Sequence, residues 1–254
     1  MYRRRSVQTT LLVLMVLSAA VSVGTRFANQ EYTFPGPLPG PKAIVIPRGT
    51  PEQVALVLKD AGAIREVWAF RIAALATRGV GPIHAGEFTF PQGASLRDVL
   101  AILRTAKPVE HHVTIREGLA AAQIALLVDG AEAMTGDTPV PREGHVLPDT
   151  YAYEFGTPRT ALLARATAAM DRTLARIWSG RAADLPLATE EDLLTVASIV
   201  ERETSKPEER PMVAAVFLNR LRLGMKLQAD PTVAYAVSGG AGTLDRPITR
   251  ADLS

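Results

Sequence analysis

The 254-residue chain contains no cysteine. Disulfide bonds, thiolate nucleophiles and cysteine-ligated metal sites are therefore excluded. The chain also lacks a run of basic residues interleaved with aromatic residues, and its formal net charge is only +2. Part of its basic character lies in three consecutive arginines at residues 3–5. We therefore do not expect nucleic acid to be a partner.

One uncharged segment, residues 6–25, follows these arginines. As an α-helix it would extend about 30 Å, which is enough to cross the hydrocarbon core of a bilayer. The arginines before it predict a cytoplasmic N-terminus and an extracytoplasmic remainder. A signal peptide cleaved near the small residues 18–20 is the alternative. We favour the anchor, which predicts a single-pass protein of the plasma (inner) membrane.

A pattern of strand, glycine turn and amphipathic helix occurs three times after a segment, 34–41, that contains four prolines. The prolines favour an extended spacer without regular hydrogen bonds. The three repeats are unequally spaced, so they do not form a solenoid array. They favour an α+β fold instead. The predicted strands are 43–46, 88–90 and 113–115, and the turns lie at Gly49, Gly93 and Gly118.

Two longer helices are predicted in the second half of the chain. The first runs from 159 to 178 and is rich in alanine, leucine and arginine. The second begins after Thr189, which suits an N-cap because a carboxylate follows three residues later. At about 100° per residue, Leu193, Ala197 and Val200 define the middle of its apolar face.

Two carboxylates, Glu201 and Glu203, fall on the shoulders of this apolar face, where an ordinary amphipathic helix avoids charge. Partial withdrawal from water favours the protonated form of a carboxyl group, as a general acid requires. The alternative is that both are helix-end residues paired with Arg202, Lys206 or Arg210. Helical spacing alone does not choose between the two glutamates.

A further helix is predicted around Pro211, with Asn219 inside it. Gln228 lies in the connection that follows, and Asp230-Pro231 suits the N-cap and first position of another helix. On residue type alone, Gln228 and Asp230 are as well explained as turn and capping residues as by a substrate role.

Several segments together resemble the MltG/YceG family of membrane-bound endolytic murein transglycosylases. The most specific are 197–204 (Ala-Ser-Ile-Val-Glu-Arg-Glu-Thr), 216–221 (Val-Phe-Leu-Asn-Arg-Leu) and 224–232 (Gly-Met-Lys-Leu-Gln-Ala-Asp-Pro-Thr). Upstream, the Glu-Gly and Leu-Pro-Asp-Thr-Tyr elements within 143–151 and the turn at 115–118 are also similar. The strand-turn-helix module after the anchor resembles the family's LysM-like subdomain.

The resemblance implies a mixed α+β architecture in four parts. These are a cytoplasmic tip and membrane anchor at 1–27, a Pro/Gly-rich linker at 28–42, a LysM-like subdomain at 43–107 and a YceG-like catalytic domain at 108–254. Members of the family continue beyond the position where this chain ends, so the catalytic domain is expected to be truncated at its C-terminus.

The resemblance also implies a lytic transglycosylase in which Glu201 is the catalytic acid/base. The substrate would be peptidoglycan glycan strands, cut between N-acetylmuramic acid and N-acetylglucosamine to leave 1,6-anhydro ends. No cofactor or metal is implied. Glu203, Asn219, Gln228 and Asp230 are candidate substrate-binding residues, and peptidoglycan synthases are candidate partners. The alternative function is a membrane-tethered peptidoglycan-binding module whose catalysis is impaired by truncation.

Overall fold

A computed structural model of the protein describes residues 30–242 and 244–253. The predicted membrane segment at 6–25 lies outside the described residues. Among those that are described, no helix is both long enough and apolar enough to cross a membrane. The chain divides into two compact units, Met1–Val109 and Glu110–Ser254, and each is described below by itself.

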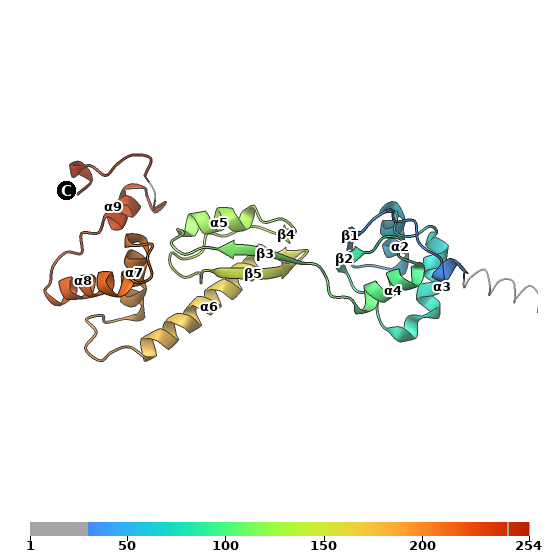
Figure 1. The fold of residues 1–254 in the computed structure, drawn as a ribbon, viewed down its shortest axis with the longest axis horizontal. Helices are drawn as coiled ribbons and strands as arrows, with labels where there is room; N and C mark the ends of the chain where they lie inside the picture. The colour runs from blue at the N-terminus through green and yellow to red at the C-terminus, as the bar shows by residue number, and fades with distance from the viewer. Residues whose placement is uncertain (1–29, 243, 254) are drawn as a thin grey trace, which may run out of the picture. The chain divides into compact units, whose positions relative to one another are not determined.

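The first unit builds one hydrophobic core from an antiparallel strand pair and three helices. Ile44 lies opposite Phe88 in the strand register, and Phe88 and Phe90 are almost completely buried. Figure 1 shows the helices packed around the strand pair. The elements are β1 (Lys42–Ile46), α2 (Pro51–Asp60), α3 (Val67–Ala76), the 3-10 helix η1 (Arg78–Val80), β2 (Gly86–Phe90) and α4 (Leu96–Thr105).

Capping residues determine where two of these helices begin. The Thr50 hydroxyl accepts a hydrogen bond from the Gln53 backbone nitrogen, and the Gln53 side-chain oxygen accepts one from the Thr50 backbone nitrogen. Ser95 and Asp98 form the same reciprocal pair at the start of α4. Because such pairs satisfy amide groups that the first turn leaves without partners, they define the residue at which each helix begins.

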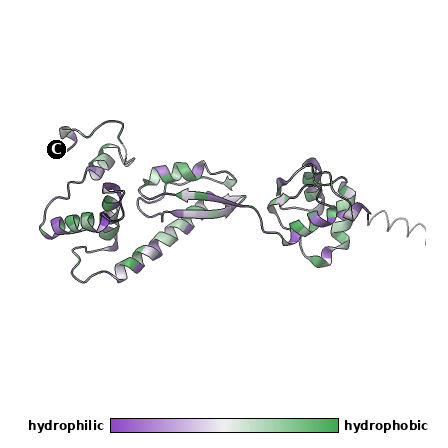
Figure 2. Ribbon diagram, viewed as in Figure 1, coloured by the Kyte–Doolittle hydropathy of each residue, from purple (hydrophilic) through white to green (hydrophobic). Residues whose placement is uncertain are grey.

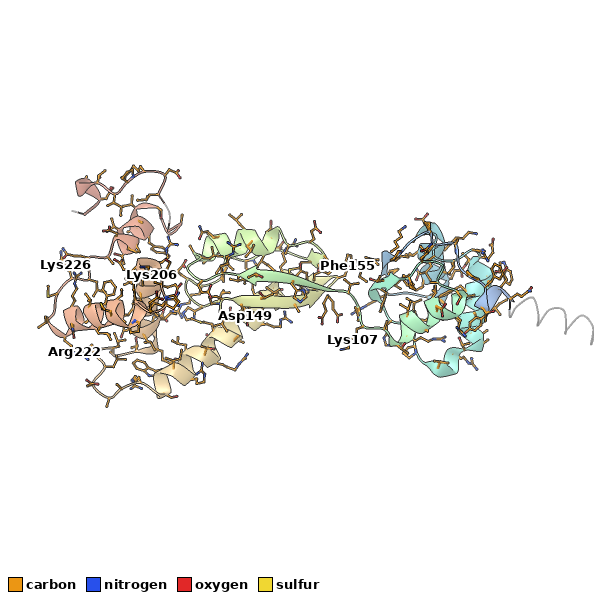
Figure 3. The ribbon with its side chains drawn as sticks, viewed as in Figure 1. Lys107, Asp149, Phe155, Lys206, Arg222 and Lys226 are labelled. Carbon is orange, nitrogen blue, oxygen red and sulfur yellow. The ribbon has the colours of Figure 1, made fainter. Side chains whose placement is uncertain are left out.

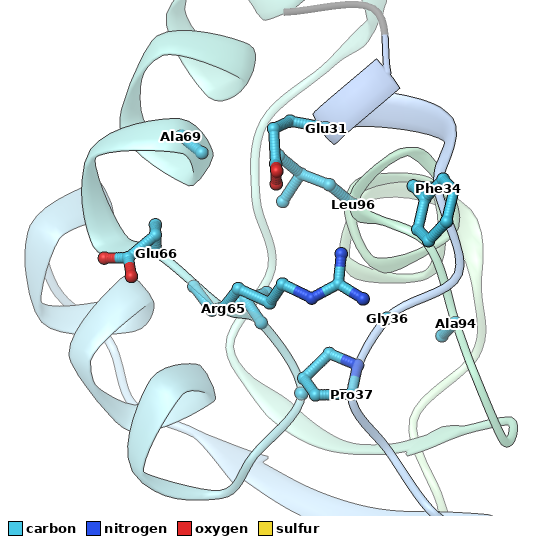
Figure 4. A pocket seen from close by; sticks show the side chains of 11 residues that line it. Glu31, Phe34, Gly36, Pro37, Arg65, Glu66, Ala69, Ala94 and Leu96 are labelled. Carbon is cyan, nitrogen blue, oxygen red and sulfur yellow. The ribbon is translucent and has the colours of Figure 1, made fainter. Parts of the chain in front are cut away.

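The proline-rich segment 34–41 has no regular structure, as predicted, but it does not extend away as a free spacer. Leu38 is only 3% exposed. The Gly36 nitrogen donates to the Gly93 carbonyl, and the Gly93 nitrogen donates to the Leu38 carbonyl, both at 3.0 Å. Figure 4 shows Arg65 reaching toward Phe34, with its guanidinium 5.4 Å from the ring centre. The segment therefore packs against the first unit.

The second unit begins with an antiparallel pair, β3 and β5, flanked by α5 and α6 (Figure 1). A short parallel pair, β4 and β6, is separate from it. Three further helices follow α6. The elements are β3 (Glu110–Ile115), α5 (Ala121–Asp129), β4 (Met134–Thr135), β5 (Asp149–Glu154), β6 (Thr157–Pro158), α6 (Arg159–Ser179), α7 (Glu190–Glu203), α8 (Arg210–Arg222), α9 (Asp230–Val237) and the 3-10 helix η2 (Arg250–Leu253).

Two apolar clusters stabilise the second unit. In the first, residues of α5 and α6 such as Val128 and Leu162 pack against β3 and β5. In the second, one face of α7 packs against Phe217 of α8 and Ala229. Hydrophobic residues predominate along α5 in Figure 2, and Leu126 of that helix is 74% exposed. Burial therefore follows packing position and not residue type alone.

The three predicted strand-turn-helix repeats are confirmed as β1–α2, β2–α4 and β3–α5. The predicted long helix is confirmed as α6. Leu162, Leu163 and Ala166 are buried, whereas Ile177 is 48% exposed. The N-terminal turns of α6 pack on the β3–β5 pair, and that cluster does not extend to Ile177. The likeness of the first unit to a LysM-like subdomain stays a prediction.

Candidate active site

Helix α7 positions the principal candidate, Glu201. As predicted, Thr189 is the N-cap: its hydroxyl accepts from the Asp192 nitrogen at 3.1 Å, and the Asp192 carboxylate accepts from the Thr189 nitrogen at 2.9 Å. These hydrogen bonds from Thr189 lower the pKa of Asp192. The charged carboxylate also lies in the first turn, where the helix dipole favours it. The N-cap of α7 thus lies twelve residues before Glu201.

The buried face of α7 is rotated relative to the prediction. Val196, Ile199 and Val200 are buried, whereas Ala197, expected near the centre of the face, is exposed. The predicted face was wrong because α7 carries apolar residues on more than one side. The packing of α8 and Ala229 selects which of them is covered.

Glu201 lies at the edge of this face, with 29% of its side chain exposed. Its Oε1 atom accepts a hydrogen bond from Arg210 Nη2 at 3.0 Å. Arg210 is the first residue of α8, so the ion pair links the end of α7 to the beginning of α8. Pairing with Arg210 is one of the alternatives that the sequence left open, and the structure confirms the contact.

The two oxygens of the Glu201 carboxyl group are not equivalent. Oε1 is held by Arg210, and no group in the described parts of the chain bonds to Oε2. An arginine beside a carboxylate stabilises its negative charge through a charge-assisted hydrogen bond. Arg210 is itself incompletely satisfied, because its buried Nε atom has no partner among the described residues. Oε2 is therefore the oxygen that is left for a further contact.

Glu203 does not share this environment. It is the last residue of α7 and is exposed, so the prediction of two half-buried carboxylates was wrong for this residue. The helix ends before any neighbouring element covers the position. Lys206, labelled in Figure 3, belongs to the connection that follows and pairs with Glu209 at 2.9 Å, not with Glu201 or Glu203.

The other predicted site residues lie on α8 and the segment after it, and none bonds to Glu201. Asn219 accepts a hydrogen bond from Arg222 at 2.9 Å, about 13 Å along α8 from Arg210 at 1.5 Å per residue. Gln228 is exposed and has a φ of 49°. Asp230 is exposed and is the first residue of α9, whereas Ala229 is the N-cap, so the predicted capping role of Asp230 was wrong.

Arg202, next to Glu201, links the end of α7 to two glycine-containing loops through hydrogen bonds. It donates to the Gly118 carbonyl at 3.2 Å and to the Gly242 carbonyl at 2.9 Å. Gly118 has a φ of 72°, and a Cβ atom there would lie 3.3 Å from Arg202 Cδ. Glycine is the residue that adopts this left-handed conformation at least cost. Sequence reasoning identified the glycine turn but not the arginine that it faces.

The Glu-Gly pair formed by Glu143 and Gly144 lies in the loop between β4 and β5. Glu143 accepts hydrogen bonds from the Ala121 nitrogen at 3.0 and 3.3 Å, at the start of α5. Burial raises the pKa of Tyr235 on α9, and the adjacent Glu143 carboxylate adds to that rise. The loop between β4 and β5 therefore contacts both α5 and α9.

His145, buried in the same loop, connects it to two more helices. Its Nε2 atom lies 3.3 Å from Glu191 on α7, and its Nδ1 atom lies 3.7 Å from Asp171 on α6. Arg142 also pairs with Glu191, at 2.9 Å. In residues 30–242 and 244–253, no group of three or more histidine and acidic side chains is placed to hold a metal ion.

Known proteins are similar in sequence to most of this chain. The model of the YceG-like family matches residues 44–254. The chain is 27% identical to an endolytic murein transglycosylase of Streptococcus pneumoniae, over 91% of this chain and 50% of that protein. It is 26% identical to one of Bacillus subtilis, over 76% of this chain and 62% of that protein. The chain thus spans about half the length of the pneumococcal relative.

Among solved structures, a YceG-like protein of Listeria monocytogenes is similar, with a TM-score of 0.45 and 23% identity. The aligned region covers 85% of this chain and 80% of that one. Because the family model covers most of the chain, including the helix that carries Glu201, the protein belongs to the YceG-like family.

Proposed function

We propose that this protein is an endolytic peptidoglycan transglycosylase and that Glu201 is its catalytic acid/base. The names of the relatives support the substrate class and the type of reaction. The environment of the Glu201 side chain supports its role as the acid/base. Its carboxyl group is partly withdrawn from water, with one oxygen held by Arg210 and the other unbonded among the described residues.

The reaction requires one group that first donates and then accepts a proton. With its proton on Oε2, Glu201 donates it to the glycosidic oxygen between N-acetylmuramic acid and N-acetylglucosamine, and the bond from the anomeric carbon to that oxygen breaks. The muramic C6 hydroxyl oxygen then bonds to the anomeric carbon, and its proton passes to Glu201. A 1,6-anhydro ring forms, no water is consumed, and the acid is regenerated.

Arg210 would stabilise Glu201 between the two proton transfers. After the first proton transfer Glu201 is a carboxylate, and the guanidinium stabilises that charge. Because Arg210 bonds to Oε1, it also fixes the direction of Oε2. No second carboxylate is needed, in contrast to hydrolysis, where one activates water or forms a covalent intermediate.

The proposal includes the setting of the reaction. The substrate is a peptidoglycan glycan strand, Glu203, Asn219, Gln228 and Asp230 are its candidate contacts, and peptidoglycan synthases are candidate partners. The protein acts outside the plasma (inner) membrane, to which its N-terminal segment anchors it, with the N-terminus cytoplasmic. Protease protection of an N-terminal tag in intact cells tests this topology, and digestion of the tag from outside would refute it.

The chemistry is tested by digesting purified peptidoglycan with the full chain and analysing the products by mass spectrometry. We expect 1,6-anhydromuramyl ends, and we expect Glu201→Gln to reduce their formation by about 100-fold or more. Glu208→Gln is the matched control, because Glu208 is exposed and has no bonding partner in the described chain. Thermal unfolding of each variant separates lost chemistry from lost folding.

Two outcomes would contradict the proposal. Products with reducing muramic ends would mean that water attacks, so the intramolecular mechanism would be wrong. Sedimentation of the chain with peptidoglycan without any new ends would instead support the alternative of a binding module.

A further inference from the structure

The first unit contains a groove that the proposed chemistry of the second unit does not use. It lies between the turn at Gly49 and Thr50, the start of α2, the end of α3 and the segment that follows η1, and its volume is about 760 Å³. Ligand sites in proteins commonly have volumes of about 300–1,000 Å³. Its apolar walls include Val54, Leu75 and Ile83.

The charged residues that line the groove are unbalanced. Arg71, Arg78 and Arg104 contribute three guanidinium groups, whereas Glu52 contributes the single carboxylate. Glu52 lies 3.6 Å from Arg71, and more than half of each side chain is exposed. An exposed pair of this kind contributes little to stability. The groove therefore combines an excess of positive charge with an apolar surface.

Arg104 is the most informative of the three arginines because it is only 9% exposed. It donates to the Thr77 hydroxyl at 2.8 Å and to the Ala74 carbonyl at 3.2 Å. Its buried Nε atom has no partner among the described residues. No carboxylate in the described chain lies within ion-pair distance of it.

A buried cation without a counter-ion is costly, and so is a buried N–H group without an acceptor. The C-terminal ends of α3 and α4 offset part of the charge through their dipoles, since Arg104 lies in the last turn of α4 and donates to the last turn of α3. They do not provide an acceptor for Nε. A ligand anion in the groove would supply the counter-charge that Arg104 lacks.

We propose that this groove binds a free carboxylate on an amphipathic ligand, and that the ligand is a peptide side chain of peptidoglycan. A guanidinium group matches a planar carboxylate through two parallel hydrogen bonds. The apolar walls suit the alkyl parts of short peptides better than they suit a small inorganic anion. The identity of the ligand rests on the proposed function, whereas the preference for a carboxylate rests on the groove itself.

Binding is tested with the full chain by isothermal titration calorimetry. The probe is N-acetylmuramyl dipeptide, which carries one free carboxylate, and the comparison compound has that carboxylate converted to a methylamide. We expect the acid to bind at least about tenfold more tightly, which corresponds to about 1.4 kcal/mol. Equal affinity for the acid and the amide would overturn the proposal. Tighter binding of inorganic phosphate than of the acid would also overturn it.

Variants of the groove localise the effect. Arg78→Gln removes an exposed guanidinium from the groove, and we expect it to weaken binding of the acid but not of the amide. Arg97→Gln is the control, because Arg97 is also exposed but does not line the groove. Arg104→Lys keeps the positive charge but removes the planar guanidinium group that matches a carboxylate, so we expect weaker acid binding. If Arg104→Lys fails to fold, the Arg78→Gln variant still tests whether the groove binds the carboxylate.

The two proposals can fail separately. Glu201→Gln should bind the acid as the unchanged protein does. A chain that prefers the acid but forms no anhydro ends would leave the groove assignment intact and refute the proposed catalysis. A chain that forms anhydro ends but binds the acid and the amide equally would refute the groove assignment and leave the proposed catalysis intact.

Discussion

Leu162→Ala is expected to destabilise the second unit, because Leu162 of α6 is fully buried against the β3–β5 pair. The substitution removes the outer carbons of the side chain and leaves a cavity that the surrounding strands and helices fill only in part. Leucine-to-alanine changes at such sites cost about 3–5 kcal/mol. For a unit of this size, a loss of about 3 kcal/mol lowers the midpoint of thermal unfolding by about 10 °C.

The matched control is Leu126→Ala on α5, where the same atoms are removed from a side chain that is 74% exposed. Surface changes usually alter stability by less than about 0.5 kcal/mol. Urea unfolding of the full chain, followed by circular dichroism, measures both variants. Since the two units have separate cores, Leu162→Ala should move the transition of the second unit alone. Similar losses in Leu162→Ala and Leu126→Ala would refute the reasoning.

Two further predictions concern local structure. Hydrogen bonds from Ser95 lower the pKa of Asp98 in the folded state, so the stability that its carboxylate contributes is present above the unfolded pKa and is lost as the pH falls. Asp98→Asn should therefore weaken the decline in stability of the first unit below about pH 4 in urea titrations at several pH values, and an unchanged acid decline would contradict this. Gly144→Ala places a Cβ atom 3.2 Å from Leu194 Cδ2 at a φ of 75°, so a loss of about 1–3 kcal/mol is expected in chemical unfolding of the second unit. Gly180→Ala, in the same unit, where φ is −94° and a Cβ atom meets nothing closer than 3.8 Å, is its control.

Much of the local structure was predictable because its causes lie within a few residues. Thr50, Ser95 and Thr189 begin α2, α4 and α7 by bonding to amide groups in the next turn. Glycines end strands and helices where the chain needs a positive φ, as at Gly93 and Gly118. These interactions do not depend on the rest of the fold, so they can be recognised in the sequence.

The environment of the candidate site was only partly predictable. Helical spacing placed Glu201 at the margin of an apolar face, and the side chain is indeed partly buried. The same spacing also placed Glu203 at that margin, where nothing covers it. It could not choose Arg210 from three nearby basic residues, because the choice depends on how the chain turns between α7 and α8.

By itself, the sequence determined the three strand-turn-helix repeats, the long helix α6, the glycine turns, the α+β class and the family signature that contains Glu201. Only the tertiary structure decided which oxygen of Glu201 is held, which face of α7 is covered, and that Arg104 is buried beside a groove without a counter-ion. The reason is physical. Caps and turns depend on neighbours in the chain, whereas burial and charge pairing depend on residues that packing brings together from distant positions.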